Sequence, residues 1–237
     1  MMKNLKLNWR MKSFSLLAGL LLIGLAPALA QSGKKTAKEE AAAYIQVTNQ
    51  RAGKIVDNMK IADRAKKLRV RNYIAQQYRD LSAIHELRDR RVKAVKETAG
   101  SNKEAADKRV AEIEEHTNAQ LAKLHETYIA NLQAQLTEEQ VDQVKDGMTY
   151  GVVPITYKGY QEMLPNLTEE QKAQIWAWLV EAREHAMDAG TSDKKHAWFG
   201  KYKGRINNYL SAAGYDLNKA SKDWAERVKA EQAAKAE

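Results

Sequence analysis

The residues best suited to chemistry are concentrated in the last hundred positions of the chain. Tyrosine and tryptophan are interleaved there with lysine, arginine, histidine and asparagine, most densely between Lys195 and Tyr209. An aromatic ring presents a flat apolar face, which suits the C–H face of a sugar ring, and arginine or lysine pairs with a carboxylate. This combination favours a binding site for an acidic sugar.

One predicted helical face carries the strongest candidates. Trp198, Tyr202 and Arg205 are separated by steps of four and three, which places them on the same side of a helix. We predict that Trp198, Tyr202 and Tyr157 stack on the sugar. Contacts to its carboxylate or hydroxyl groups are predicted for a set of polar residues, Arg183, Lys203, Arg205, Asn207 and Asn208. The alternative is that the aromatic rings only pack in the core, and the sequence leaves both open.

Two glycines, Gly200 and Gly204, lie inside the same predicted helix. Each costs about 1 kcal/mol relative to alanine in a helix interior. We therefore expect them to permit the close approach of another backbone or of a ligand.

A catalytic alternative uses some of the same residues. His196, Tyr202 and Arg205 could move a proton and neutralise a carboxylate, as a uronate lyase requires. The sequence has no nucleophile elbow, phosphate loop or zinc-binding histidine pair. Binding is therefore preferred to catalysis, and no catalytic residue or cofactor is assigned.

A metal site is also weighed and not adopted. Glu181, His185 and Asp188 share a helix face, which could hold a metal ion. A solvated face of charges spaced at i, i+4 is the preferred interpretation.

The first thirty residues are typical of a secretory signal peptide. Four basic residues precede an apolar run from Phe14 to Leu25, and the segment ends Ala28-Leu29-Ala30. This order predicts cleavage after Ala30, a chain beginning at Gln31, and a periplasmic or secreted location. The alternative, a membrane anchor, needs a longer apolar run. No cysteine follows Ala30, so a lipid anchor is excluded and no membrane anchor is expected after cleavage.

The composition limits the partners. The chain has no cysteine, which excludes disulfides, thiol nucleophiles and thiolate metal sites. Four of its positive charges lie in the predicted signal peptide, which leaves +5 of the net charge of +9 for the remainder. This mild excess favours anionic partners. Export and interspersed acidic residues argue against nucleic acid, although many arginines lie between residues 64 and 91.

The fold class predicted is all-α, because helix-forming residues are abundant and proline is rare. Apolar periodicity predicts helices over 36–59, 61–98 and 101–135, the first and third starting with capping boxes at Thr36 and Ser101. The two long helices should form an antiparallel hairpin, packed with a C-terminal bundle of shorter helices. The regions are then the signal peptide (1–30), the hairpin region (31–135) and an aromatic-rich helical region (136–237), the last two within one domain.

Two identical pentads, Leu136–Gln140 and Leu167–Gln171, each read as a helix start in which threonine and glutamine form a capping box. We prefer this to a true internal repeat, because the flanking sequences differ. Between the pentads, Gly147–Ile155 is predicted to be extended, since Pro154 disfavours helix at Val153. A short helix at 157–163 should follow.

Three further helices are predicted towards the C-terminus. The first runs from 169 to 189 and ends at Gly190 as a left-handed stop. The second covers 194–212, and the third is capped by Asp216.

Three segments, Asp146–Pro154, Glu181–Glu184 and Lys195–Leu210, resemble those of a secreted bacterial family, the domain-of-unknown-function family numbered 3826, which is described as sugar-binding. The resemblance covers nearly all of the chain after Ala30. It implies an exported protein of polysaccharide-degradation systems, with pectin-type glycans as a theme. It supplies no catalytic residues.

A weaker likeness comes from the pentads, which are similar to those of Spy-type periplasmic chaperones. It implies a chaperone or envelope interaction protein as a second alternative. The leading hypothesis is an exported protein that binds an acidic oligo- or polysaccharide.

Overall fold

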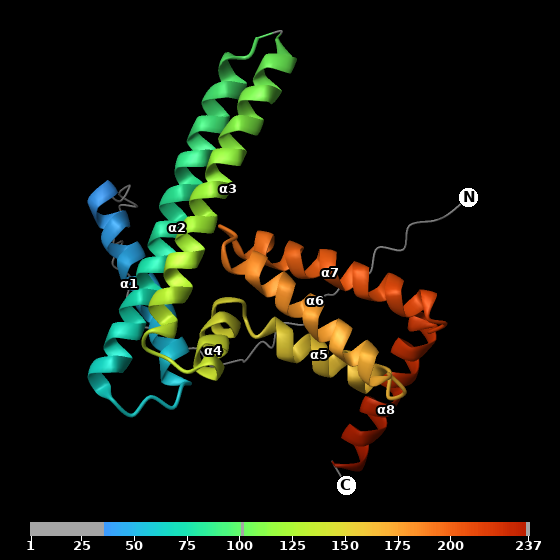
Figure 1. Ribbon diagram of the computed structural model, residues 1–237. Helices are drawn as coiled ribbons and strands as arrows, with labels where there is room; N and C mark the ends of the chain where they lie inside the picture. Colours follow the sequence, from blue (N-terminus) through green and yellow to red (C-terminus); the bar gives the residue numbers. More distant parts are fainter. Residues whose placement is uncertain (1–35, 101, 236–237) are drawn as a thin grey trace, which may run out of the picture. The chain divides into compact units, whose positions relative to one another are not determined.

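The computed structural model describes residues 36–100 and 102–235. The predicted signal peptide and Ser101 lie outside these residues. The described residues form α-helices joined by short turns, and the all-α prediction is confirmed (Figure 1). The helices are α1 (Ala37–Asp57), α2 (Arg64–Thr98), α3 (Lys103–Gln133), α4 (Glu138–Met148), α5 (Val152–Met163), α6 (Glu169–Met187), α7 (Ser192–Ala212) and α8 (Leu217–Ala234).

The two longest helices form the predicted antiparallel hairpin. Helices α2 and α3 run side by side, and α1 lies along α2 (Figure 1). The Asp63 carboxylate caps α2 by accepting hydrogen bonds from the amides of Ala65 and Lys66. The cap of α3 is Asn102, which accepts from the Ala105 amide, so the predicted cap at Ser101 was placed one residue too early.

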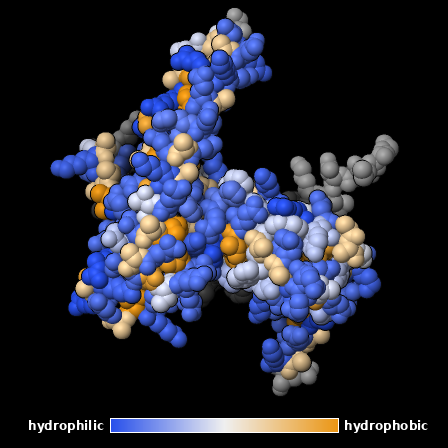
Figure 2. Space-filling view, viewed as in Figure 1, coloured by the Kyte–Doolittle hydropathy of each residue, from blue (hydrophilic) through white to orange (hydrophobic). Residues whose placement is uncertain are grey.

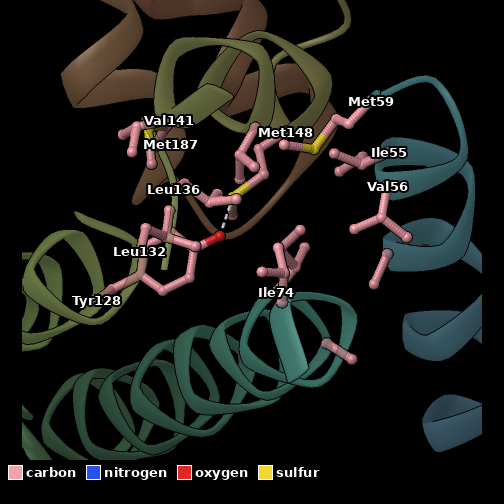
Figure 3. Packing of buried hydrophobic residues seen from close by; sticks show 14 of the residues in the cluster. Ile55, Val56, Met59, Ile74, Tyr128, Leu132, Leu136, Val141, Met148 and Met187 are labelled. Carbon is pink, nitrogen blue, oxygen red and sulfur yellow. Dashed lines mark hydrogen bonds between the residues drawn. The ribbon is translucent and has the colours of Figure 1, made fainter. Parts of the chain in front are cut away.

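A first hydrophobic cluster joins the hairpin to α1 and α4. Figure 3 shows Ile55 of α1 and Met59, just after α1, facing Met148 of α4, with Ile74 of α2 beneath them. The Tyr128 hydroxyl, from α3, donates to the sulfur of Met148 over 3.2 Å. Burial of these side chains fixes α4 against the lower part of the hairpin, because apolar area removed from water is the main stabilising term.

A second hydrophobic cluster lies among α5, α6 and α7. Its fully buried side chains include Ile175 and Leu179 of α6, with Phe199, Ile206 and Leu210 of α7. Met187, at the end of α6, belongs to the first cluster instead. Helix α6 therefore contributes to both cores, and the predicted packing of the hairpin with a bundle of shorter helices is confirmed.

Both pentads are helix starts, as predicted. The Thr137 hydroxyl accepts a hydrogen bond from the backbone amide of Gln140, and the Gln140 side-chain oxygen accepts one from the backbone amide of Thr137. Thr168 and Gln171 repeat this pair of bonds at the start of α6. Each capping box satisfies two backbone amides that the helix leaves free.

The extended segment predicted at Gly147–Ile155 is wrong. Helix α4 continues to Met148, and α5 starts at Val152. The chain turns between them through two left-handed residues, Tyr150 at φ 62° and Gly151 at φ 65°. Pro154 is the third residue of α5, where its missing amide hydrogen costs nothing because first-turn amides have no acceptor within the helix.

Gly190 does not act as a left-handed stop. Helix α6 ends at Met187, and Gly190 has no positive φ. A Cβ atom on Gly190 would lie 2.7 Å from the ring of His85 on α2. Glycine is therefore needed here for the close approach of the α6–α7 turn to the hairpin. Gly214, by contrast, is left-handed after α7, and Asp216 caps α8 as predicted.

The surface of the α2–α3 hairpin is mainly hydrophilic (Figure 2). None of the helices in the part of the chain that the structure describes is both long and apolar enough to cross a membrane. The described helices belong to one compact unit.

Candidate ligand-binding site

The aromatic side chains predicted to stack on a sugar are largely engaged with other protein groups. Trp198 is half-buried, and its ring stacks on His185 with centroids 4.4 Å apart. The Lys201 ammonium lies 5.0 Å from the centroid of the same ring. Tyr157 is packed edge-on against Trp176 at 5.0 Å. Trp198 also lines a hollow of about 690 Å³ formed by α2, α3, the end of α6 and α7, so part of it remains within reach of a ligand.

Tyr202 and Arg205 lie together as predicted, but they meet at a carboxylate. Tyr202 is buried and its hydroxyl donates to Glu181 over 2.7 Å. Arg205 approaches the other oxygen of Glu181 at 3.6 Å and lies over the ring of Trp178. The ring of Tyr202 is therefore part of the core and presents no open face for stacking.

His196 lies elsewhere. It stacks on Tyr150 with centroids 5.3 Å apart, whereas Tyr202 and Arg205 point to Glu181. The structure therefore does not bring the three candidate catalytic residues together.

The residues considered for a metal are also dispersed. Glu181 accepts from Tyr202, His185 stacks on Trp198, and the Asp188 carboxylate contacts His125 at 2.9 Å. Within residues 36–100 and 102–235 no three histidine, aspartate or glutamate side chains are grouped closely enough to hold a metal ion.

Arg183 is buried in a network of charges, with 2% of the residue exposed. Its guanidinium donates to Asp142 and Asp146 of α4. Next to it, Glu184 accepts from Lys145, and its pKa is lowered to about 2 because hydrogen bonds from His125 and Lys145 outweigh the effect of burial. Arg183 thus holds α6 against α4, and its donors face away from solvent.

The remaining polar candidates on α7 are at the surface. Lys203 and Asn208 are exposed, and the Asn207 side chain accepts a hydrogen bond from Tyr160 over 2.7 Å. A Cβ atom on Gly200 or Gly204 would meet nothing within 4 Å. The expected approach of another backbone to these glycines is wrong, because the space beside them is open.

A larger pocket lies on the other side of the α6–α7 turn. Its volume is about 800 Å³, and it is formed by α1, α2, α4, the start of α7 and the turns that follow α4 and α6. We call it the Tyr150 pocket. The polar residues that line it include Tyr44, Arg51, Lys54, Asn58, Tyr78, Gln143, Asp146, Tyr150 and Lys195.

Positive charge dominates this lining. Among the described residues, no carboxylate forms an ion pair with Arg51, Lys54 or Lys195, which all line the pocket. The acid of the pocket, Asp146, is already bound by Arg183 at 2.8 Å. The pocket therefore carries cations that the fold itself does not neutralise.

Lys195 is the most unusual of these cations, since lysine is almost never buried without a charged partner. It is 6% exposed, and its ammonium donates to the carbonyl oxygens of Ala186 and Met187, each over 3.0 Å. Burial, against the opposing charge of Asp188 and with help from the charge of Arg51, lowers the pKa of Lys195 to about 8.

Three tyrosines complete the pocket. The Tyr44 hydroxyl donates to the Tyr78 carbonyl over 3.1 Å and ties α1 to α2. Burial raises the pKa of Tyr78 to about 12, so its phenol stays protonated and can donate a hydrogen bond. Tyr150 is 53% exposed and has φ 62°. A non-glycine residue in this conformation costs about 1–3 kcal/mol, and such residues cluster at ligand sites.

The pocket was not predicted from the sequence, although one signal pointed to it. Lys195 precedes Phe199 by four residues and continues the buried stripe of Phe199, Tyr202 and Ile206, so helical periodicity places a lysine at a core position. Arg51 and Lys54 had no comparable signal, because basic residues on a surface helix are ordinary.

The fold and the pocket define an all-α protein with a basic, tyrosine-lined cavity. A comparison with curated proteins finds no match. The chain matches the family described as "Protein of unknown function (DUF3826)" over residues 45–230, and it belongs to that family. The matched range contains every residue of the pocket except Tyr44.

Proposed function

We propose that this protein binds an acidic carbohydrate, of the uronic-acid type, in the Tyr150 pocket. The observation that carries the proposal is the set of three cations, Arg51, Lys54 and Lys195, without a carboxylate partner among the described residues. A uronate carboxylate would supply the missing charge through charge-assisted hydrogen bonds.

The remaining lining of the pocket suits the rest of a sugar. The phenols of Tyr78 and Tyr150, with the amides of Asn58 and Gln143, offer donors and acceptors for hydroxyl groups, and aromatic rings offer faces for C–H groups. A volume of about 800 Å³ lies within the range of small-molecule sites, about 300–1,000 Å³. One or two sugar rings are an appropriate ligand for such a space.

The exposed part of α7 is a second place where the same ligand could bind. Gly200 and Gly204 favour it, because each lowers helix stability by about 1 kcal/mol and no described atom requires a glycine there. The contacts would then be made by Trp198, Lys203, Arg205, Asn207 and Asn208, with Tyr157 as a further stacking residue. Arg205 would have to leave Glu181.

Calorimetry with two matched variants separates the two places. The probe is a galacturonic acid trimer, with a galactose trimer as the neutral control. Arg51→Gln should weaken binding roughly tenfold or more, the equivalent of one charge-assisted contact. Arg205→Gln removes a cation of the same type from α7 and should leave the affinity unchanged.

The opposite result, a loss only with Arg205→Gln or Trp198→Ala, moves the site to α7. Equal binding of the charged and neutral trimers contradicts an acidic ligand, and no binding of any glycan contradicts the proposal. Analysis of the bound trimer for shortened products then tests the lyase alternative.

We further propose that the protein works outside the cytoplasm, after cleavage behind Ala30. The support is the order of basic, apolar and small residues in the first thirty positions. N-terminal sequencing of the protein from its native host should give Gln31 as the first residue. A chain that still begins at Met1 or Met2 contradicts this.

A further inference from the structure

Lys195 lacks a neutralising group although it is buried. Two of its three ammonium hydrogens are used by the Ala186 and Met187 carbonyls at 3.0 Å. These bonds satisfy the end of α6, but carbonyl groups do not cancel a full charge. Removing an ammonium from water costs several kcal/mol unless an opposite charge compensates. A lysine at a helix end can bond the last carbonyls and is favoured by the helix dipole, but the partial charge of about half a unit at that end does not neutralise a full positive charge.

The charged and titratable groups around Lys195 supply only part of the missing charge. Those nearest in the fold are Arg51 and Lys54 on α1, Tyr78 on α2, Asp146 on α4, Tyr150 in the α4–α5 turn, Asp188 on α6 and His196 on α7. Asp146 is bound by Arg183, and Asp188 is bound by His125. Asp146 is therefore committed to another cation, and Asp188 offsets the charge of Lys195 only in part and makes no ion pair with it, while Arg51 adds a second positive charge.

We propose that Lys195 is the floor of an anion subsite, in which one carboxylate group of the ligand binds between Lys195 and Arg51. The third ammonium hydrogen of Lys195 and the guanidinium of Arg51 each donate to one carboxylate oxygen. This inference rests on the proposed function for the identity of the sugar, but its chemistry requires only a carboxylate.

The subsite links ligand binding to proton uptake. The free pocket holds Lys195 in a setting that favours the neutral amine, through burial and the charge of Arg51. A bound carboxylate favours the ammonium. Near the pKa of about 8 that Lys195 has without ligand, binding should therefore take up about half a proton, and near pH 6 it should take up almost none. Affinity should fall as the pH rises above 8.

The test is calorimetry of the galacturonic acid trimer at pH 8 and pH 6, each in two buffers of different ionisation enthalpy. Wild type should take up a proton fraction at pH 8 only. Lys195→Met should abolish the uptake and weaken binding roughly tenfold or more. Lys195→Arg should keep most of the affinity with no uptake, because arginine stays charged. Circular dichroism of each variant checks that the helices are intact.

A second arm does not depend on the sugar. Acetic anhydride modifies neutral amines, so the labelling rate of Lys195 at pH 8, read by mass spectrometry, reports whether an anion covers it. Malonate, a small dicarboxylate, should slow labelling of Lys195 severalfold and leave the exposed Lys194 unchanged. Protection by malonate without glycan binding keeps the subsite and contradicts the glycan proposal. Glycan binding without proton uptake, and without loss in Lys195→Met, overturns the subsite alone. Absence of protection and of binding overturns both.

Discussion

Arg183 and Lys195 are two buried cations with opposite surroundings. Arg183 is 2% exposed and donates to two carboxylates of α4. Lys195 is 6% exposed and donates to two carbonyls, with no described carboxylate in an ion pair. The fold alone explains the first residue, because paired charges can be buried. Lys195 is explained better by an anionic ligand that binds beside it. Whether a buried charge has a carboxylate partner within the protein thus indicates whether it serves folding or binding.

The largest effect is expected from removing the paired cation. Arg183→Met leaves Asp142 and Asp146 beside an apolar side chain. We expect a loss of about 2–4 kcal/mol in the free energy of unfolding, somewhat below the value for fully buried pairs because Asp142 is half exposed. Urea titration followed by circular dichroism measures it.

Lys195→Met is the matched control. It should change stability by less than about 1 kcal/mol, because relief of a buried charge offsets two lost hydrogen bonds. Equal losses in the two variants would contradict the distinction between the two cations.

A second contrast concerns two glycines, Gly190 in the pocket lining and Gly200 on α7. Gly190→Ala places a Cβ atom 2.7 Å from the His85 ring, whose Nε2 donates a 2.7 Å hydrogen bond to the Asp188 carbonyl. Overpacking of this kind costs about 1–3 kcal/mol. Gly200→Ala, in open space on α7, should stabilise the protein by about 0.5–1 kcal/mol. Thermal unfolding of both variants gives the comparison, and a stable Gly190→Ala protein would show that the turn can move.

His125 and Lys195 should make stability depend on pH in opposite directions. Hydrogen bonds to Asp188 and Glu184 raise the pKa of His125 from 6.5 to about 9, so its contribution is complete below pH 6.5 and is lost as the pH rises through 9. The pKa of Lys195 falls from 10.5 to about 8, so burying it becomes less costly, and stability rises, between pH 8 and 10.5.

Each effect should be on the order of 1–2 kcal/mol after allowance for partial exposure. The urea midpoint of wild type should be measured between pH 6 and 10. His125→Gln should remove the fall in midpoint with rising pH, and Lys195→Met should remove the rise above pH 8. A wild-type slope that neither substitution alters would show that other groups control the pH dependence.

The smallest effects compare the two helix caps. Thr137→Ala and Thr168→Ala each remove a hydroxyl that accepts an amide hydrogen bond, and each should cost about 1 kcal/mol in a urea titration. Thr127→Ala, within α3, is the control and should cost less. Loss of glycan binding without loss of stability would make either cap part of a functional surface.

The helices could be predicted because the signals for them are local. Capping residues such as Thr137 and Asp216 and the apolar periodicity of α2 and α3 act within a few positions of the chain. The turn at Tyr150 could not be predicted, because packing of α4 and α5 overrides the preference that Pro154 imposes on Val153. The local sequence around Pro154 does not show whether this proline lies in an extended segment or in the first turn of a helix.

The site was harder to predict than the fold. Aromatic and basic residues on α7 gave a strong sequence pattern, yet Tyr202 and Arg183 are used inside the protein. The Tyr150 pocket depends on Arg51 and Lys195, which are distant in sequence and meet through tertiary packing. Spacing along one helix shows which side chains share a face but not what that face contacts.

The end of α6 is held by three other helices at once. Lys195 of α7 binds its last carbonyls, His125 of α3 binds the Asp188 carboxylate, and His85 of α2 binds the Asp188 carbonyl. Helix ends usually fray on their own, but this one can open only if contacts to all three partners break. Residues 186–190 should therefore exchange their amide hydrogens at the slow rate of a cooperative unit rather than the fast rate of a helix terminus. A ligand that binds Lys195 therefore contacts the point where α6 is joined to α2, α3 and α7, and local opening of α6 requires breaking its contacts with all three.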